Sequence, residues 1–240
     1  MSNFEPHITA APAGEIQMRR ESRSSVKTVT SLAMLTALTY VAMLLSKLLP
    51  QISGFLQMDV KDTVVCIGGF LFGPLSAAII SIVVALVEMF TVSDTGIIGL
   101  IMNVLATCAF CCTASFIYKK MRTRKGAVLG LLLGTLVLTV VMVLWNYLIT
   151  PIYMHMDRSV VAAMLPTVFL PFNLVKGGLN AALTLVLYKP VVTALRKAKL
   201  APERDAAQKS GDRFDAGFLL FSLALLVTFV LLVLVLAGKI

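Results

Sequence analysis

Three polar residues lie close together in an otherwise apolar segment, within the stretch PFNLVKGGLN at positions 171–180. Asn173, Lys176 and Asn180 are spaced i, i+3 and i+7, so a helix places all three on one face. Polar side chains inside membrane helices are costly and usually functional. Two amides and one ammonium group can hold a ligand through hydrogen bonds. The spacing therefore predicts part of a small-molecule site.

Other apolar segments bring polar or aromatic residues to the same end of the predicted bundle. They are Glu88, Asn103, Asn146 with its neighbour Trp145, and Asp59 in the first loop. Amides, one cation and aromatics suit a flat, neutral ligand that forms hydrogen bonds. Simpler interpretations exist for single residues: Lys176 can snorkel to the lipid interface, Trp145 can belong to an aromatic belt, and the asparagines can join helices.

The elements that position these residues are membrane helices. Hydrophobic residues make up 58% of the 240 residues and charged residues only 14%, which no soluble domain of this size can accommodate. The apolar runs are long and continuous, which favours helices over a β-barrel. We predict an all-α integral membrane protein with spans near 31–49, 63–72, 74–90, 97–118, 127–149, 169–188 and 214–237. The second and third spans are separated by a turn at Gly73-Pro74.

Basic residues predict the orientation of the chain. The net charge is +9, and most Lys and Arg residues form three clusters, at 19–27, 119–125 and 189–213. Clusters at span ends indicate the cytoplasmic side and not nucleic-acid binding. All three clusters fall on one side if the Gly73-Pro74 turn separates two spans. The N-terminus is then cytoplasmic and the C-terminus outside.

The chain divides into four parts by composition. We predict a disordered cytoplasmic tail at 1–26, a six-helix membrane core at 27–198, a polar basic linker at 199–213 and an additional helix at 214–240. The four cysteines fall inside apolar runs, which favours packing over metal binding. No GxxxxGK[ST] phosphate loop is present, so energy for any uphill transport must come from a partner.

Three stretches together carry a resemblance to a known family: FLQMDVKDTVVCIGGFLFGPLSAAII, TVVMVLWNYLITPIY and PFNLVKGGLNAALTLVLYKP. The chain resembles the S component, the substrate-binding subunit, of energy-coupling factor (ECF) vitamin transporters, in the riboflavin-binding branch. The resemblance covers Lys27 to about Arg196 and implies a six-helix core without enzymatic activity or a cofactor. It implies riboflavin as transported ligand, with a transmembrane coupling protein and two ATPase subunits as partners in the bacterial cell membrane.

The resemblance also implies roles for individual residues. Asn146, Asn173 and Lys176 match the groups that contact the flavin ring. Ala33 and Ala37 match a small-xxx-small motif that docks on the coupling protein, although ordinary helix packing explains the same spacing. The segment that lids the pocket corresponds to Phe55, Leu56, Gln57, Met58 and Asp59. We expect acceptors of the ligand to satisfy the buried Lys176 ammonium.

Two departures from the family pattern leave the ligand open. Residues 94–97 read DTGI where the family usually has a glycine-rich TGG turn, and Lys61 replaces a common serine in the first loop. An S component for another small heterocycle is therefore an alternative. An intramembrane enzyme would need Glu88 with His155, the only visible acid–base pairing, and no nucleophile joins them. A sensor or assembly protein, which would bind no small ligand, is the third class.

Overall fold

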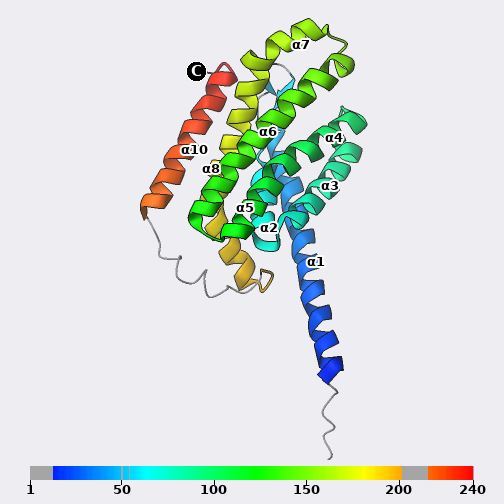
Figure 1. Cartoon of the computed structure of the whole chain (residues 1–240), viewed down its shortest axis with the longest axis vertical. Helices are drawn as coiled ribbons and strands as arrows, with labels where there is room; N and C mark the ends of the chain where they lie inside the picture. The colour runs from blue at the N-terminus through cyan, green and yellow to red at the C-terminus, as the bar shows by residue number, and fades with distance from the viewer. Residues whose placement is uncertain (1–12, 50, 54, 202–215, 240) are drawn as a thin grey trace, which may run out of the picture.

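The computed structural model describes residues 13–49, 51–53, 55–201 and 216–239, which form a bundle of membrane helices and one short hairpin (Figure 1). In chain order the elements are α1 (Ala13–Ser46), β1 (Gln51–Ile52), β2 (Leu56–Gln57), α2 (Lys61–Phe72), α3 (Pro74–Thr91), α4 (Gly96–Thr107), η1 (Cys108–Cys112), α5 (Thr113–Met121), α6 (Arg124–Tyr153), α7 (Arg158–Met164), η2 (Leu165–Phe169), α8 (Leu170–Lys197) and α10 (Ala216–Leu236). The predicted all-α membrane fold, with six core segments and one additional helix, is confirmed.

Six helical segments of the described chain are long and apolar enough to cross a membrane. The remaining core segment is α2, which has only 12 residues. It ends at Gly73, whose φ of +99° is a conformation that favours glycine, and Pro74 opens α3. The predicted Gly-Pro turn between a short second span and the third span is therefore confirmed.

Helix α1 begins earlier than predicted. We expected a disordered tail over residues 1–26, but the helix covers Ala13 onward, so that expectation is wrong for this part. Residues 15–26 contain no glycine or proline, and the apolar span behind them supplies a formed helix from which further turns can extend. Residues 1–12 and most of the linker at 199–213 lie outside the described residues.

Two π-helical turns allow long helices where we predicted loops or straight spans. Segment η1 joins α4 to α5, and η2 joins α7 to α8, so that Arg158–Lys197 is one continuous helical segment. The spans predicted near 127–149 and 169–188 imply a loop between them, and most of that loop is wrong, because α6 extends to Tyr153 and the helix resumes at Arg158. Pro166 lies in η2, where the widened turn accommodates a residue that would break a regular α-helix.

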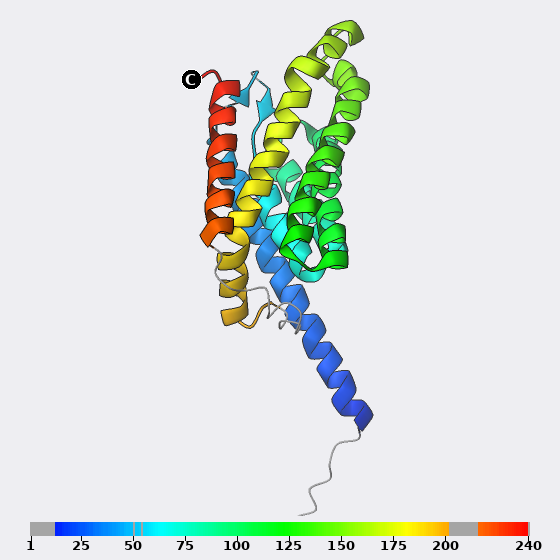
Figure 2. The same ribbon diagram turned by 60° about the vertical axis from the view of Figure 1, so that its left-hand side comes forward.

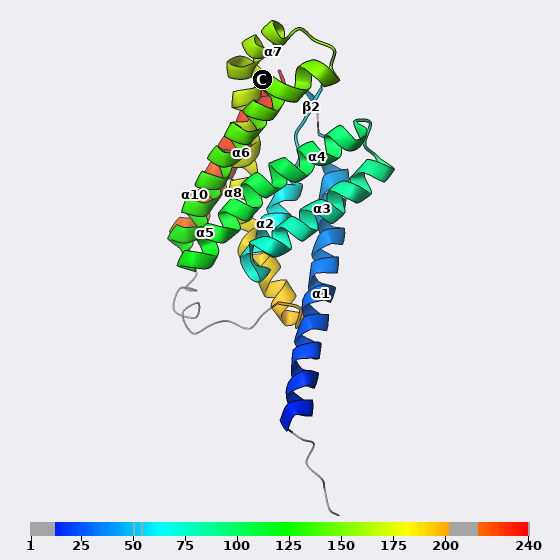
Figure 3. The same cartoon turned by 45° about the vertical axis from the view of Figure 1, so that its right-hand side comes forward.

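The first loop forms an antiparallel hairpin, which was not predicted from the sequence. Gln51 pairs with Gln57 and Ile52 with Leu56. Figure 3 shows the hairpin at the end of the bundle that also carries α7 and the α3–α4 connection. The Gly73 turn and the α5–α6 connection lie at the opposite end (Figure 1).

The additional helix α10 packs against α8 (Figure 2). A Cβ atom at Gly178 would lie 2.1 Å from the ring of Phe229, so the absence of a side chain on α8 makes room for that ring. Near the hairpin, Val233 joins a hydrophobic cluster with Ile52, Met58 and side chains of α8. Helix α10 thus covers one flank of the hairpin.

Candidate ligand-binding site

The hairpin end of the bundle holds a buried network of charged and amide side chains. At its centre, the Lys176 Nζ of α8 lies 2.7 Å from Asp59 Oδ2, in the segment that leads from β2 to α2. Burial alone would raise the pKa of the Asp59 carboxyl, but the ammonium groups of Lys176 and Lys61 outweigh it and hold this pKa below its usual value. Asp59 therefore stays ionised at neutral pH.

Asn180 fixes the start of α2 against α8. Its Nδ2 donates to the Asp59 carbonyl at 2.9 Å, and its Oδ1 accepts from the Thr63 backbone N–H and from the Thr63 hydroxyl, each at 3.0 Å. The side chain is fully buried. Every polar atom of this amide is thus used within the protein, so Asn180 positions Asp59 and α2 rather than meeting a ligand.

A second ion pair joins α2 to α3. Lys61 Nζ lies 2.9 Å from Glu88 Oε2, and Asn103 Nδ2 of α4 donates to the same oxygen at 3.1 Å. The two ion pairs neighbour Asp62, whose Oδ1 accepts from the Thr107 hydroxyl at 2.7 Å. Three carboxylates thus face two ammonium groups, and the cluster carries a formal charge of −1 when all five groups are ionised.

Asn146 and Asn173 form hydrogen bonds outside this network. Asn146 donates to the Met142 carbonyl at 2.6 Å and accepts from the Thr150 hydroxyl at 2.9 Å, all on α6. Asn173 donates to the Phe169 carbonyl at 2.7 Å. These bonds use only part of each amide, so both residues keep hydrogen-bonding capacity for a ligand. Trp145 is half-buried and packs against the main hydrophobic core.

The predicted lid residues cover the network. Met58 is fully buried in the cluster beneath the hairpin, and Leu56 packs against that cluster. Phe55 meets Phe169 edge-to-face, with ring centroids 5.9 Å apart. Gln57 donates to the carbonyls of Ser46 and Leu49, which ties the hairpin to the end of α1. The lid is held by these few local contacts.

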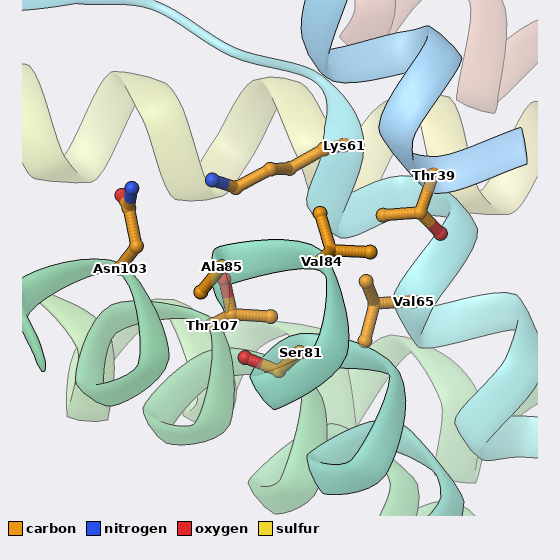
Figure 4. Close-up of a pocket in the computed structure, with 8 residues that line it drawn as sticks. All are labelled: Thr39, Lys61, Val65, Ser81, Val84, Ala85, Asn103 and Thr107. Carbon is orange, nitrogen blue, oxygen red and sulfur yellow. The ribbon is translucent and has the colours of Figure 1, made fainter. Parts of the chain in front are cut away.

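A small cavity opens beside the second ion pair (Figure 4). Its volume is about 10 Å³, which is room for about one water molecule. The ends of Lys61 and Asn103 point toward one another at one side of it. The lining comes from four helices: Thr39, Lys61, Val65, Ser81, Val84, Ala85, Asn103 and Thr107.

The structure differs from the sequence-based expectation at Lys176. We expected the ligand to supply the acceptor for its ammonium group, but Asp59 already does so. Lys61 was not predicted as a site residue and was noted only as a departure from the family pattern. Its signal was present, because a lysine at the start of an apolar helix needs a buried partner, and the Glu88 carboxylate was already predicted at the same end of the bundle.

No group of three or more metal-ligating side chains in the described ranges is arranged to hold a metal ion. The thiols of Cys66 and Cys111 meet inside the core at 3.1 Å, below the ion-pair network. Hydrogen-bond donors and acceptors lie next to a closed apolar lid. Such an arrangement suits the noncovalent binding of a ligand.

Comparison with known proteins gives a consistent result. Residues 27–188 match the family described as ECF transporter, substrate-specific component. The riboflavin transporter RibU of Staphylococcus aureus is 28% identical over 186 residues, covering 75% of this chain and 97% of that protein. The riboflavin transporter FmnP of Bacillus subtilis is 32% identical over 161 residues, covering 63% of this chain and 85% of that protein.

A solved structure supports the same relationship. The S component of a bacterial ECF transporter is similar with a TM-score of 0.61 and 27% identity, and the match covers 72% of this chain and 99% of that chain. These relatives are transporters and not enzymes. The part of this chain that the family match leaves out includes α10.

Proposed function

Because the chain belongs to the family of ECF transporter substrate-specific components, we propose that it binds riboflavin, or a closely related flavin, and delivers it for ATP-driven uptake. The observation that carries this proposal is the similarity to two proteins named riboflavin transporters over most of the core. The site supports it, since amides with unused donors and acceptors lie at the lidded end of the bundle.

In this proposal, Asn146 and Asn173 bind the polar edge of the flavin ring. Their remaining amide groups can pair with ring carbonyl, nitrogen and N–H groups, which alternate as acceptors and donors. Lys176 contributes through the side of its ammonium group that Asp59 does not occupy, because that group has three donors. The hairpin moves aside to admit the ring and closes over it with Phe55 and Met58.

The direction of transport follows from the charge clusters. We propose that the hairpin end faces outside and the basic end faces the cytoplasm, in the bacterial cell membrane. The chain holds no phosphate loop, so the energy comes from a module of one transmembrane coupling protein and two ATPases. Ala33 and Ala37 lie exposed on α1 and are the proposed docking residues for the coupling protein.

The proposal is tested by direct binding and by uptake. Titration of the purified, flavin-free protein with riboflavin should quench flavin fluorescence at a 1:1 ratio, and thiamine and biotin should neither bind nor compete. Liposomes with this chain alone should take up no riboflavin, whereas liposomes with the whole module should do so only with ATP. A protein that ignores flavins but binds another vitamin would replace riboflavin with that ligand.

A further inference from the structure

We propose that the additional helix α10 is a brace for the hairpin lid, which slows both the entry and the exit of the ligand and leaves the affinity nearly unchanged. The helix lies outside residues 27–188, which match the family, so it is an addition to the core. The inference rests on the proposed function in one respect, because it requires that the hairpin opens to admit a ligand. It concerns the rate of that opening and not the identity of the ligand.

The lid depends on packing for its closed position. Its two strands have two residues each, and a two-stranded hairpin is only marginally stable on its own. Ile52 is 3% exposed and Met58 is fully buried, and both belong to one hydrophobic cluster. The burial of these two side chains therefore helps to hold the lid against the bundle.

Helix α10 contributes to the same cluster. Val233 is one of its buried members, and Leu236 and Ala237 pack against it. Figure 2 shows the C-terminal end of α10 beside the hairpin. Opening of the lid therefore takes Ile52 and Met58 out of a cluster that α10 helps to form.

Helix α10 is also fixed at points away from the lid. Near its start, the Arg124 guanidinium of α6 lies 5.7 Å from the centre of the Phe218 ring. Further along, the Phe229 ring fills the space beside Gly178. Lipid tails are as apolar as these side chains, but they move aside easily, whereas a helix that is held at two further points does not. We therefore expect α10 to oppose motion of the lid more than lipid would.

The consequence for binding is kinetic. A lid that covers a site must open for the ligand to enter and again for it to leave. Packing against α10 stabilises the closed lid whether or not the site is occupied, so it lowers both rates by a similar factor. The dissociation constant is the ratio of the two rate constants and changes little. The ligand stays bound for longer, which favours its retention until delivery.

The first test measures both rates by stopped-flow flavin fluorescence, with the full chain in nanodiscs. Val233→Ala should raise the association and the dissociation rate constants of riboflavin about 2- to 10-fold, as expected for a small loss of buried apolar volume. The dissociation constant should stay nearly the same. Val235→Ala is the matched control, because Val235 lies on the same helix but is 54% exposed, and it should change neither rate.

The second test needs no flavin. In a background without the four native cysteines, the thiol introduced by Met58→Cys lies at a position that the closed lid buries. A membrane-impermeant maleimide should label this thiol about 2- to 10-fold faster after Val233→Ala, because the lid opens more often. Val235→Ala should leave the labelling rate unchanged.

The two tests separate the brace from the proposed function. If riboflavin binds but neither rate constant responds to Val233→Ala, the brace is overturned while the proposed function stands. A rise in the dissociation rate constant alone would also overturn it, because α10 would then stabilise only the occupied site. If labelling responds as expected but wild type binds no flavin, the brace stands and riboflavin is the wrong ligand.

Discussion

Lys176 and Asp59 form a buried ion pair of 2.7 Å between α8 and the segment that follows the hairpin. The pair links the lid to the helix that carries two of the proposed binding residues. It also means that the charge on Lys176 is compensated before any ligand arrives. Substitution of either partner alone therefore leaves an uncompensated buried charge, which is more damaging than removing both.

The first prediction separates binding from stability at this pair. Lys176→Met should lower the unfolding free energy by about 3–5 kcal/mol and weaken riboflavin binding about 10- to 150-fold. Asp59→Asn combined with Lys176→Met should recover most of the stability but not the affinity. Thermal unfolding in lipid nanodiscs and isothermal titration measure the two effects. Lys189→Met, at an exposed position near the opposite end, is the control. Recovery of full affinity in the double variant would show that Lys176 serves stability alone.

A second prediction concerns the contact between Gly178 and Phe229. Gly178→Ala places a Cβ atom where the Phe229 ring lies, so α10 must shift and the midpoint of thermal unfolding should fall. Adding Phe229→Ala should restore part of that loss, because the smaller side chain vacates the space. Leu223→Ala, at an exposed site of α10, is the matched control and should not rescue Gly178→Ala. Equal rescue by both would mean that the ring contact does not position α10.

Truncation gives a third prediction. A chain that ends at Lys199 should still bind riboflavin with nearly unchanged affinity, because the apolar face of α8 that α10 covers can meet lipid at little cost. The similar S component aligns over 99% of its own length with only 72% of this chain, in agreement with a sufficient six-segment core. Fluorescence titration of the truncated protein in nanodiscs is the measurement. A folded truncated protein with strongly weakened binding would show that α10 shapes the site through the hairpin.

The fourth prediction concerns orientation. In a background that lacks Cys66, Cys108, Cys111 and Cys112, a cysteine at position 122 should resist an impermeant thiol reagent in intact cells and react after permeabilisation. A cysteine at the exposed hairpin position 53 should react in intact cells. The reverse pattern would invert the proposed topology.

Sequence periodicity was sufficient for the helical segments and for the shared face of Asn173, Lys176 and Asn180. Periodicity could not show which charged side chains pair, because an ion pair such as Lys61–Glu88 joins two helices. The packing of the whole bundle determines how close those helices lie. The same limit explains the unexpected partner of Lys176. The helix that continues through Pro166 was missed because sequence rules treat proline as a helix end. In the structure a π-helical turn accommodates this proline.

The short length of α2 determines how the membrane voltage acts on a ligand that binds near Lys61. Twelve residues of helix reach about 18 Å, whereas the hydrocarbon core of a bilayer is about 30 Å thick. In the proposed orientation the Gly73 turn is at the cytoplasmic side, which places Lys61 and the cavity beside it well below the outer surface, within the drop of the transmembrane voltage. A charge moved across the whole drop changes in energy by about 2.3 kcal/mol per 100 mV. We therefore expect binding of a neutral flavin to be insensitive to voltage, and binding of an anionic flavin from outside to be opposed by an inside-negative potential.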